Sequence, residues 1–304
     1  MLDEGSVKTE GWHRSCQKTG FNLAGGRHGG VVRNITSCSM EQEVLFCSSA
    51  KRADFSIGPT ADHDWKGGTI PMDWLMRSRA VLGPQVLQRL QLCRVAVLGL
   101  GGVGGAAAEA LCRSGVGHLL LVDADHFEGS NLNRQTLSTC QNLGVAKTQA
   151  ARERLLSIAP DCQIQTAQTF YLPDNREFLF SFRPDVVVDA IDTVIAKLDL
   201  AQTCAQRNIP LIACMGTGNR LQPELLQIGD VTDTVGCGCP LAKVYRRELK
   251  KRGIVRQTVV FSTELPRSVC VETTEHGRHS PGSVAFVPPV AGYLMASWVV
   301  RQFL

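Results

Sequence analysis

A continuous apolar run, Arg94–Leu100, leads directly into a glycine-rich turn and then into Ala106–Ser114, a segment of helical composition. This order of strand, turn and helix fits the pattern G-x-G-x-x-G, whose glycines let the backbone turn tightly and approach a phosphate closely. The helix that follows directs its free N–H groups and the positive end of its dipole at the anion. The glycines that we expect to bind a nucleotide are Gly99, Gly101, Gly102 and Gly104.

Apolar runs and helical segments alternate along the middle of the chain. The expected strands are Arg94–Leu100, His118–Asp123, Gln163–Ala167, Pro184–Ala190 and Pro210–Met215, and the helices between them are Ala106–Ser114, Ala146–Ile158 and Val194–Arg207. This alternation at short spacing predicts an α/β fold with a Rossmann-like, doubly wound and mostly parallel sheet. Beyond Gly216 the alternation weakens, and a basic helix (Leu241–Lys251), a strand (Thr258–Thr263) and a terminal helix form a C-terminal α/β extension.

Residues 1–71 differ from the rest of the chain. They are rich in Gly, Ser, Thr and charged residues and show no sustained hydrophobic period. We expect them to be a disordered extension, or an upstream read-through before a start near Met72. Residues 72–304 are then the single folded domain.

Composition excludes several classes of protein. A net charge of only +4 over 304 residues means that any nucleic acid must bind to a local basic patch. The apolar run Val284–Leu304 contains two prolines, and the part after them has only about fifteen residues. Because a membrane span needs about 20 residues, we expect a buried helix that begins after the prolines, and no membrane association.

Twelve cysteines are scattered along the chain without any C-x-x-C pair, which argues against a structural zinc site. Several lie in apolar segments, where a thiol behaves as a small hydrophobic group. This usage indicates a reducing, cytoplasmic setting. The cysteines of the apolar segments are Cys93, Cys112, Cys204 and Cys214.

The identity of the nucleotide depends on the residues that follow the glycine turn. Asp123 ends the second expected strand, where an acid can hold ribose hydroxyls, but both ATP and NAD carry that ribose. Asn131 and Arg134 come on the next loop, and Lys147 begins a helix. Cations have no evident role in hydride transfer, whereas they would neutralise a triphosphate and its pyrophosphate leaving group. ATP is therefore favoured over NAD.

Two carboxylates lie at the carboxyl end of the fourth expected strand, the edge where open α/β sheets bind ligands. Asp192 is placed to hold Mg²⁺ against the phosphates. Asp189 lies closer to the strand and is expected to cap or orient the turn. Taken singly, Arg134 and Lys147 read as solvated charges, and only the joint occurrence of these residues supports a site.

These motifs together resemble the ThiF/MoeB/HesA superfamily, adenylating enzymes related to ubiquitin activation, from about Arg77 to the C-terminus. The matching motifs are G-x-G-G-V-G, D-x-D, S-N-x-N-R-Q, Lys147 and A-I-D-T. The resemblance implies that residues 72–304 form a ThiF-type ATP-binding domain. In it, Asp123 binds the ribose, Asn131, Arg134 and Lys147 hold the phosphates, and Asp192 binds Mg²⁺. Arg77 matches an arginine that reaches the partner subunit's ATP, so a homodimer is implied.

Within the superfamily the chain is most similar to the tRNA threonylcarbamoyladenosine dehydratase branch. The similar segments are Gly101–Ala110, Asp192–Leu200, Met215–Asn219, Cys239–Lys243, Phe261–Glu264 and Pro281–Phe286. That branch adenylates the threonyl carboxylate of a modified tRNA adenosine, and the ureido nitrogen then closes a ring and expels AMP. An intramolecular nucleophile removes the need for a protein thiolate. Cys237 and Cys239 are open to two interpretations, reactive or merely packed.

Other interpretations of the sequence stay open at this point. The basic segment between Lys243 and Arg252 either contacts tRNA phosphates or is a solvated helix face. Adenylation of the C-terminal glycine of a ubiquitin-like sulfur carrier is the second candidate function, although those activators usually carry two C-x-x-C pairs. A nucleotide-binding adaptor without turnover and a dehydrogenase are the others. Assistance by a sulfur-transfer system with a cysteine desulfurase is also left open.

Overall fold

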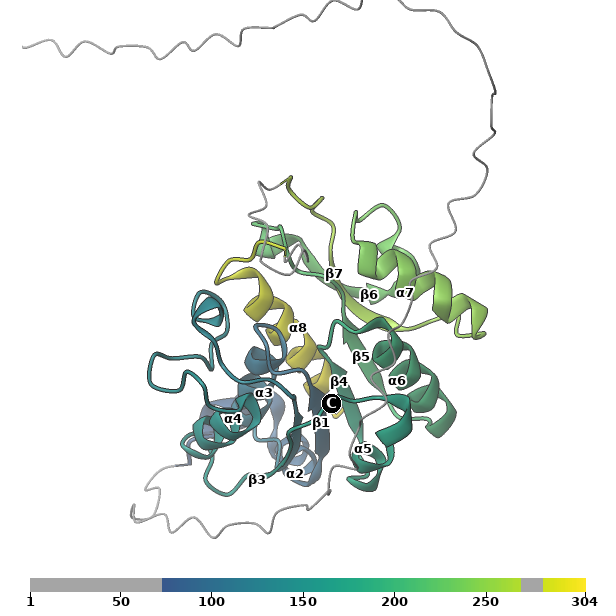
Figure 1. The fold of residues 1–304 in the computed structure, drawn as a ribbon. Helices are drawn as coiled ribbons and strands as arrows, with labels where there is room; N and C mark the ends of the chain where they lie inside the picture. The colour runs from purple at the N-terminus through teal and green to yellow at the C-terminus, as the bar shows by residue number, and fades with distance from the viewer. Residues whose placement is uncertain (1–72, 269–280) are drawn as a thin grey trace, which may run out of the picture. The chain divides into compact units, whose positions relative to one another are not determined.

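Seven strands form one sheet in a computed structural model that describes residues 73–268 and 281–304 (Figure 1). The strand order is β3-β2-β1-β4-β5-β7-β6, and all neighbours are parallel except β6 and β7. The strands are β1 (Arg94–Leu98), β2 (His118–Val122), β3 (Gln163–Ala167), β4 (Val186–Asp189), β5 (Leu211–Cys214), β6 (Leu226–Asp230) and β7 (Thr258–Ser262). The predicted doubly wound, mostly parallel sheet is confirmed. The predictions for residues 1–71 lie outside the described residues.

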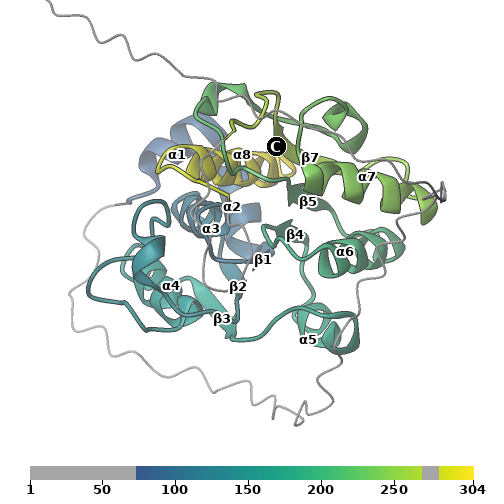
Figure 2. The same cartoon turned by 45° about the horizontal axis from the view of Figure 1, so that its top comes forward.

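Helices cover both faces of this sheet, as Figures 1 and 2 show. One face carries α1 (Met76–Leu82), α2 (Pro84–Leu92), α3 (Gly104–Arg113), α4 (Lys147–Leu156) and α8 (Val287–Arg301). The other carries α5 (Glu177–Ser181), α6 (Val194–Arg207) and α7 (Pro240–Lys251). Short 3-10 turns lie at Gly129–Asn131, Pro173–Asn175, Pro223–Leu225 and Val231–Thr234.

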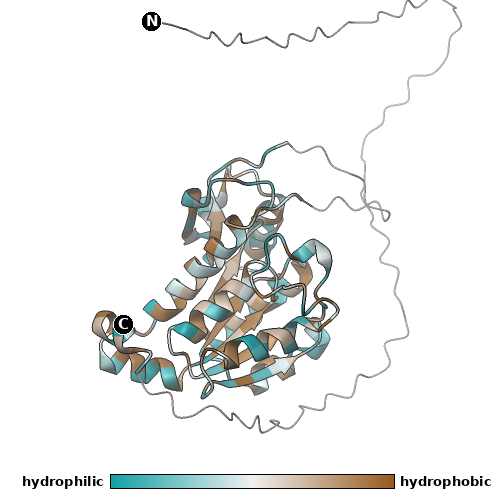
Figure 3. Ribbon diagram, turned by 90° about the vertical axis from the view of Figure 1, so that its left-hand side faces the viewer, coloured by the Kyte–Doolittle hydropathy of each residue, from teal (hydrophilic) through white to brown (hydrophobic). Residues whose placement is uncertain are grey.

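Alternate residues of the five central strands, β1, β2, β4, β5 and β7, enter two separate hydrophobic cores. In β1, Val95 and Val97 face the core under α3, α4 and α8, whereas Ala96 and Leu98 face the core under α6 and α7. Burial on both faces explains why the strands appear in the sequence as continuous apolar runs. In Figure 3 brown, hydrophobic residues gather along the strands, and the covering helices mix brown with teal.

The six predicted strands are all present, and their ends differ from the prediction by at most two residues. The antiparallel edge strand β6 and the helices α1, α2 and α5 had not been predicted. The predicted start of the terminal helix was wrong, because α8 begins at Val287 and includes Pro288 and Pro289 in its first turn. Prolines are tolerated there, since the first helical N–H groups have no intrahelical partner to lose.

Helix α8 packs closely against α3 through a glycine. A Cβ atom on Gly292 would lie 2.2 Å from the carbonyl oxygen of Val103, so a larger residue would separate the two helices. Most of one side of α8 is buried. In the described part of the chain no helix is both long and apolar enough to span a membrane.

The cysteines of the apolar segments are buried, as predicted. Burial raises the pKa of Cys93, Cys204 and Cys214 to about 12, so these thiols stay neutral and pack as small hydrophobic groups. Cys237 and Cys239 are also buried, and the Cys239 sulfur accepts a hydrogen bond from the Ala242 N–H at the start of α7. The packing interpretation of this pair is therefore favoured.

Candidate nucleotide-binding site

A pocket of about 220 Å³ opens at the carboxyl ends of β1, β2 and β4. The chain runs from β1 to β2 and β3 on one side and then crosses to β4 and β5 on the other, so this is the switch point of the sheet. Open α/β sheets bind their ligands in that crevice. The lining includes five of the predicted site residues, namely Gly99, Gly101, Asp123, Lys147 and Asp192.

The glycine turn needs glycine at two positions for its own geometry. Gly99 has φ +85°, a conformation that other residues rarely adopt, and a Cβ there would lie 2.7 Å from the Ala190 carbonyl oxygen. A Cβ on Gly104 would lie 1.7 Å from the Gly99 carbonyl oxygen. By contrast, a Cβ on Gly101 would meet only the Gln135 side chain, at 4.0 Å. The space beside Gly101 is thus open to a ligand.

Asp123 and Lys147 face each other across the pocket, and both side chains are 8% exposed. One Asp123 carboxylate oxygen accepts the Leu100 N–H at 2.6 Å, which ties the end of β2 to the glycine turn. The Lys147 ammonium lies 2.8 Å from Asp125 Oδ2 and 4.0 Å from Asp123 Oδ1. Two carboxylates therefore compensate a nearly buried cation at the N-terminus of α4, where the helix dipole disfavours positive charge.

The two carboxylates at the carboxyl end of β4 have different environments. Asp192 is exposed in the pocket wall, whereas Asp189 is fully buried and lies 3.0 Å from the Lys197 ammonium. Burial raises the pKa of Asp189, and the Lys197 charge opposes that rise. Asp189 Oδ1 accepts the Ile191 N–H at 3.2 Å. The orienting role predicted for Asp189 agrees with this contact.

The remaining predicted residues do not belong to the described pocket lining. The Asn131 side chain accepts the Glu128 N–H, and Arg134 donates to the Ser130 carbonyl and to Asn133 Oδ1. Both residues thus shape their own loop in this structure. A Cβ on Gly102 would lie 2.9 Å from Pro288, which indicates close packing against α8. Arg77 is exposed on α1 and has no place in the pocket lining.

Sequence reasoning missed two features of the pocket. Phe170, on the loop after β3, is 63% exposed at the pocket, and its carbonyl is held by the Asn175 side chain at 2.8 Å. The adjacent Tyr171 is buried and donates to Asp199 at 2.7 Å. Asp125, the partner of Lys147, was the other omission. Asp125 is the second acid of the D-x-D motif, but the sequence had suggested no role for it.

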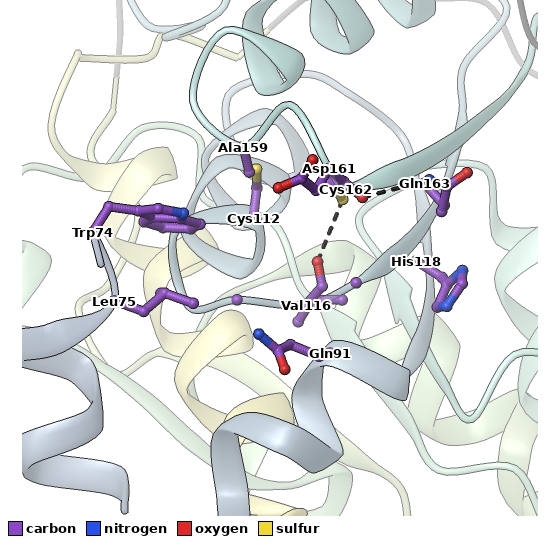
Figure 4. A pocket seen from close by; sticks show the side chains of 12 residues that line it. Trp74, Leu75, Gln91, Cys112, Val116, His118, Ala159, Asp161, Cys162 and Gln163 are labelled. Atoms are coloured by element: carbon purple, nitrogen blue, oxygen red, sulfur yellow. Dashed lines mark hydrogen bonds between the residues drawn. The ribbon is translucent and has the colours of Figure 1, made fainter. Parts of the chain in front are cut away.

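A second pocket, of about 280 Å³, lies at the opposite edge, near the start of β2 and β3. In Figure 4, Trp74 and Leu75 line one side, and Cys112, Asp161 and Cys162 line another. The Cys162 thiol donates to the Val116 carbonyl at 3.3 Å. The described lining of this second pocket holds no lysine or arginine to neutralise a phosphate, whereas the glycine-lined pocket contains Lys147. The glycine-lined pocket is therefore favoured over it as the candidate nucleotide site.

Similarity to known proteins extends over most of the chain. A model of the ThiF family matches residues 75–304. The chain belongs to the ThiF family. A protein of Bacillus subtilis (strain 168) named tRNA threonylcarbamoyladenosine dehydratase is 38% identical over 239 residues, which are 75% of this chain and 93% of the relative.

Solved structures of an E. coli protein have the same fold. The crystal structure of E. coli tRNA N6-threonylcarbamoyladenosine dehydratase in complex with AMP matches with a TM-score of 0.69 at 30% identity. The match covers 78% of this chain and 97% of that chain. The complex of the E. coli protein with ATP matches with a TM-score of 0.68 at 31% identity, over 78% of this chain and 97% of that one.

We expect ATP to stabilise this ThiF family member more than NAD does, because Lys147 offers a cation to the phosphates. Ligand at a hundred times its Kd raises the free energy of unfolding by about 2.7 kcal/mol. Thermal-shift titrations with ATP and with NAD measure the difference. Equal or greater stabilisation by NAD would contradict the assignment of the pocket.

Proposed function

We propose that this chain is an ATP-dependent tRNA threonylcarbamoyladenosine dehydratase, which activates the threonyl carboxylate as an acyl-adenylate. The observation that carries the proposal is the convergence of Gly101, Asp123, Lys147 and Asp192 on one pocket at the switch point of the sheet. Family membership and the dehydratase relatives over most of the chain support the same reaction.

In the first step a carboxylate oxygen attacks the α-phosphorus of ATP and pyrophosphate leaves. The pocket residues position ATP for this attack. Open space beside Gly101 admits the phosphates, and the N-terminus of α3 directs N–H groups toward them. Lys147 then exchanges its Asp125 contact for phosphate oxygens and stabilises the charge that develops on the leaving group. Arg134, on the neighbouring loop, is proposed to turn toward the same phosphates.

Asp192 suits a Mg²⁺ ion held together with the ATP phosphates. Its carboxylate is exposed in the pocket wall and is a hard oxygen ligand. The described residues hold no cluster of three or more metal-ligating side chains, but Mg²⁺ in nucleotide sites commonly uses one or two carboxylates plus phosphates. When bound, the ion would supply positive charge beside the leaving pyrophosphate.

In the second step the ureido nitrogen attacks the activated acyl carbon, loses its proton to solvent and expels AMP. The nucleophile belongs to the substrate, so no protein thiolate is needed. Burial of Cys237 and Cys239 fits a reaction without a covalent enzyme intermediate. A sulfur-carrier activator is disfavoured, because the sequence has no C-x-x-C pair.

Helix α7 is the proposed tRNA-contacting surface, although its charge is partly compensated. Glu248 forms ion pairs with Arg247, Lys251 and Arg252. Lys243 and Lys250 are exposed. Because phosphate contacts release counterions, replacing Lys243 and Lys250 by glutamine is expected to weaken tRNA binding and to reduce its salt dependence.

A symmetric homodimer follows from the proposed role of Arg77, which is exposed and lies outside its own chain's pocket lining. We expect mixtures of an Arg77→Ala chain and an Asp192→Ala chain to regain activity, because one site of each heterodimer would be intact. Turnover of the mixture is compared with that of each variant alone. Absence of rescue would show that each subunit completes its own site.

The function is tested with tRNA that carries threonylcarbamoyladenosine. Incubation with ATP and Mg²⁺ is expected to convert the nucleoside into a form lighter by one water, with AMP and pyrophosphate released in equal amounts. Mass spectrometry of the digested tRNA follows the conversion. ATP binding without any conversion would instead favour the adaptor that binds nucleotide without turnover.

A cytoplasmic location is proposed because the cysteines of the described residues are free, and a reducing compartment keeps them so. Assistance by a cysteine desulfurase, which the sequence leaves open, is tested by co-purification with a tagged chain.

A further inference from the structure

Lys197 is a fully buried cation on α6 that the proposed reaction does not use directly. Its ammonium lies 3.0 Å from Asp189 Oδ2, which is also fully buried, and 5.8 Å from the centre of the Tyr245 ring. Removing two charges from water is costly, and well-packed apolar residues are often at least as stable in such places. Stability alone therefore gives a weak reason for this ion pair.

The second contact of each partner indicates another role. Asp189 Oδ1 accepts the Ile191 N–H at 3.2 Å, and the Lys197 ammonium donates to the Ile191 carbonyl at 3.1 Å. Both polar groups of one backbone residue are thus held by the two members of one ion pair. Ile191 immediately precedes Asp192 in the pocket wall.

The same backbone residue also borders the glycine turn. A Cβ on Gly99 would lie 3.2 Å from the Ile191 side chain and 2.7 Å from the Ala190 carbonyl oxygen. The loop between β4 and α6 therefore has little room to move toward the glycine turn. The Asp189–Lys197 ion pair restrains it through the hydrogen bonds to Ile191. A shift of the loop would move the Asp192 carboxylate relative to the phosphates.

We infer that Asp189 and Lys197 are positioning residues, which fix the N–H and carbonyl of Ile191 and thereby set Asp192 against Mg²⁺-bound ATP. The inference rests on the role proposed for Asp192. Neither positioning residue lines the described pocket, so both act through the backbone between them.

A matched pair of double variants tests the inference. Both contain Asp189→Asn, which keeps an oxygen acceptor for the Ile191 N–H and removes the charge. The first adds Lys197→Gln, which keeps an N–H donor, and the second adds Lys197→Met, which has nearly the same shape without a donor. Arg207→Met removes an exposed cation from the same helix and serves as the control.

Two quantities are measured after thermal unfolding has shown which variants fold. The first is the increase in ATP affinity that Mg²⁺ produces without RNA, and the second is turnover of modified tRNA. The Gln variant and the control are expected to keep the Mg²⁺ response and to stay within about tenfold of wild-type turnover. The Met variant is expected to lose most of the Mg²⁺ response and about a hundredfold in turnover, as for a misplaced catalytic group.

The inference would be overturned if Mg²⁺ increased the ATP affinity of the folded Gln and Met variants equally. It would also be overturned if Mg²⁺ did not change the ATP affinity of the wild-type protein. If the Met variant does not fold, the Gln variant decides: a retained response supports the inference, and its loss overturns it. If wild-type protein does not convert the modified tRNA, the proposed function fails, and the Mg²⁺ response still decides the positioning role.

Discussion

Replacing Asp192 by alanine is expected to slow adenylation by about a hundred- to a thousandfold, the usual effect of losing one electrostatic contact to a developing charge. The fold is expected to survive, because the side chain is exposed in the pocket wall and forms no hydrogen bond or ion pair with another described residue. Pyrophosphate release with modified tRNA measures the rate, and circular dichroism measures the fold.

Asp189→Ala is the comparison variant, and its effect should include a loss of stability. This substitution leaves the Lys197 ammonium buried without its partner, which typically costs about 3–5 kcal/mol of stability. We therefore expect a lowered Tm, which Asp192→Ala should not show, together with the slower turnover that follows from releasing the Ile191 N–H. A folded and inactive Asp189→Ala enzyme, beside an Asp192→Ala enzyme of normal rate, would show that Asp189 and not Asp192 is the Mg²⁺ ligand.

The second large effect is expected at Gly104. An alanine Cβ there would overlap the Gly99 carbonyl oxygen at 1.7 Å, so the start of α3 must move away from the turn. Gly104→Ala is therefore expected to lower both the Tm and the ATP affinity. The position of a Cβ atom is fixed by the backbone, so its overlap with a carbonyl oxygen cannot be relieved by side-chain rotation. Overpacking of this kind costs roughly 1–3 kcal/mol or more.

Gly101→Ala separates the effect on stability from the effect on ATP affinity. The protein leaves room for a Cβ at this position, so the Tm is expected to stay near that of the wild type. The methyl group would occupy space assigned to the phosphates, so ATP affinity is expected to fall. Thermal unfolding and ATP titration of the two variants test the pair. Normal ATP affinity in Gly101→Ala would place the phosphates elsewhere.

The sequence was sufficient to predict the central strands because each is buried on both faces and is therefore apolar throughout. It was insufficient for β6, an edge strand whose LQIGD sequence combines a glycine and a charge with only two apolar residues. Helix α2 was missed because it is short, with only three buried residues, Val86, Leu87 and Leu90, in a segment of nine residues.

Prediction of the site likewise depended on whether a residue lies next to an element with a clear apolar pattern. Asp123, Lys147 and Asp192 were found because each follows a recognisable strand or begins a helix. Lys197 was not found, because a lysine in an amphipathic helix normally indicates a solvated face, and only the folded structure shows its burial beside Asp189. The side-chain direction of Arg134 likewise depends on its own loop and could not be read from spacing.

The contacts of α8 with the glycine turn have a consequence for synthesis of the chain. Pro288 lies beside Gly102, and Gly292 beside Val103, so residues made more than 180 positions apart share one packed surface. At roughly 5–20 residues per second, that separation corresponds to about 10–40 s of translation. During this interval a nascent chain would present the small-residue side of α3 to its surroundings. The nucleotide site would reach its final form only when α8 emerges from the ribosome.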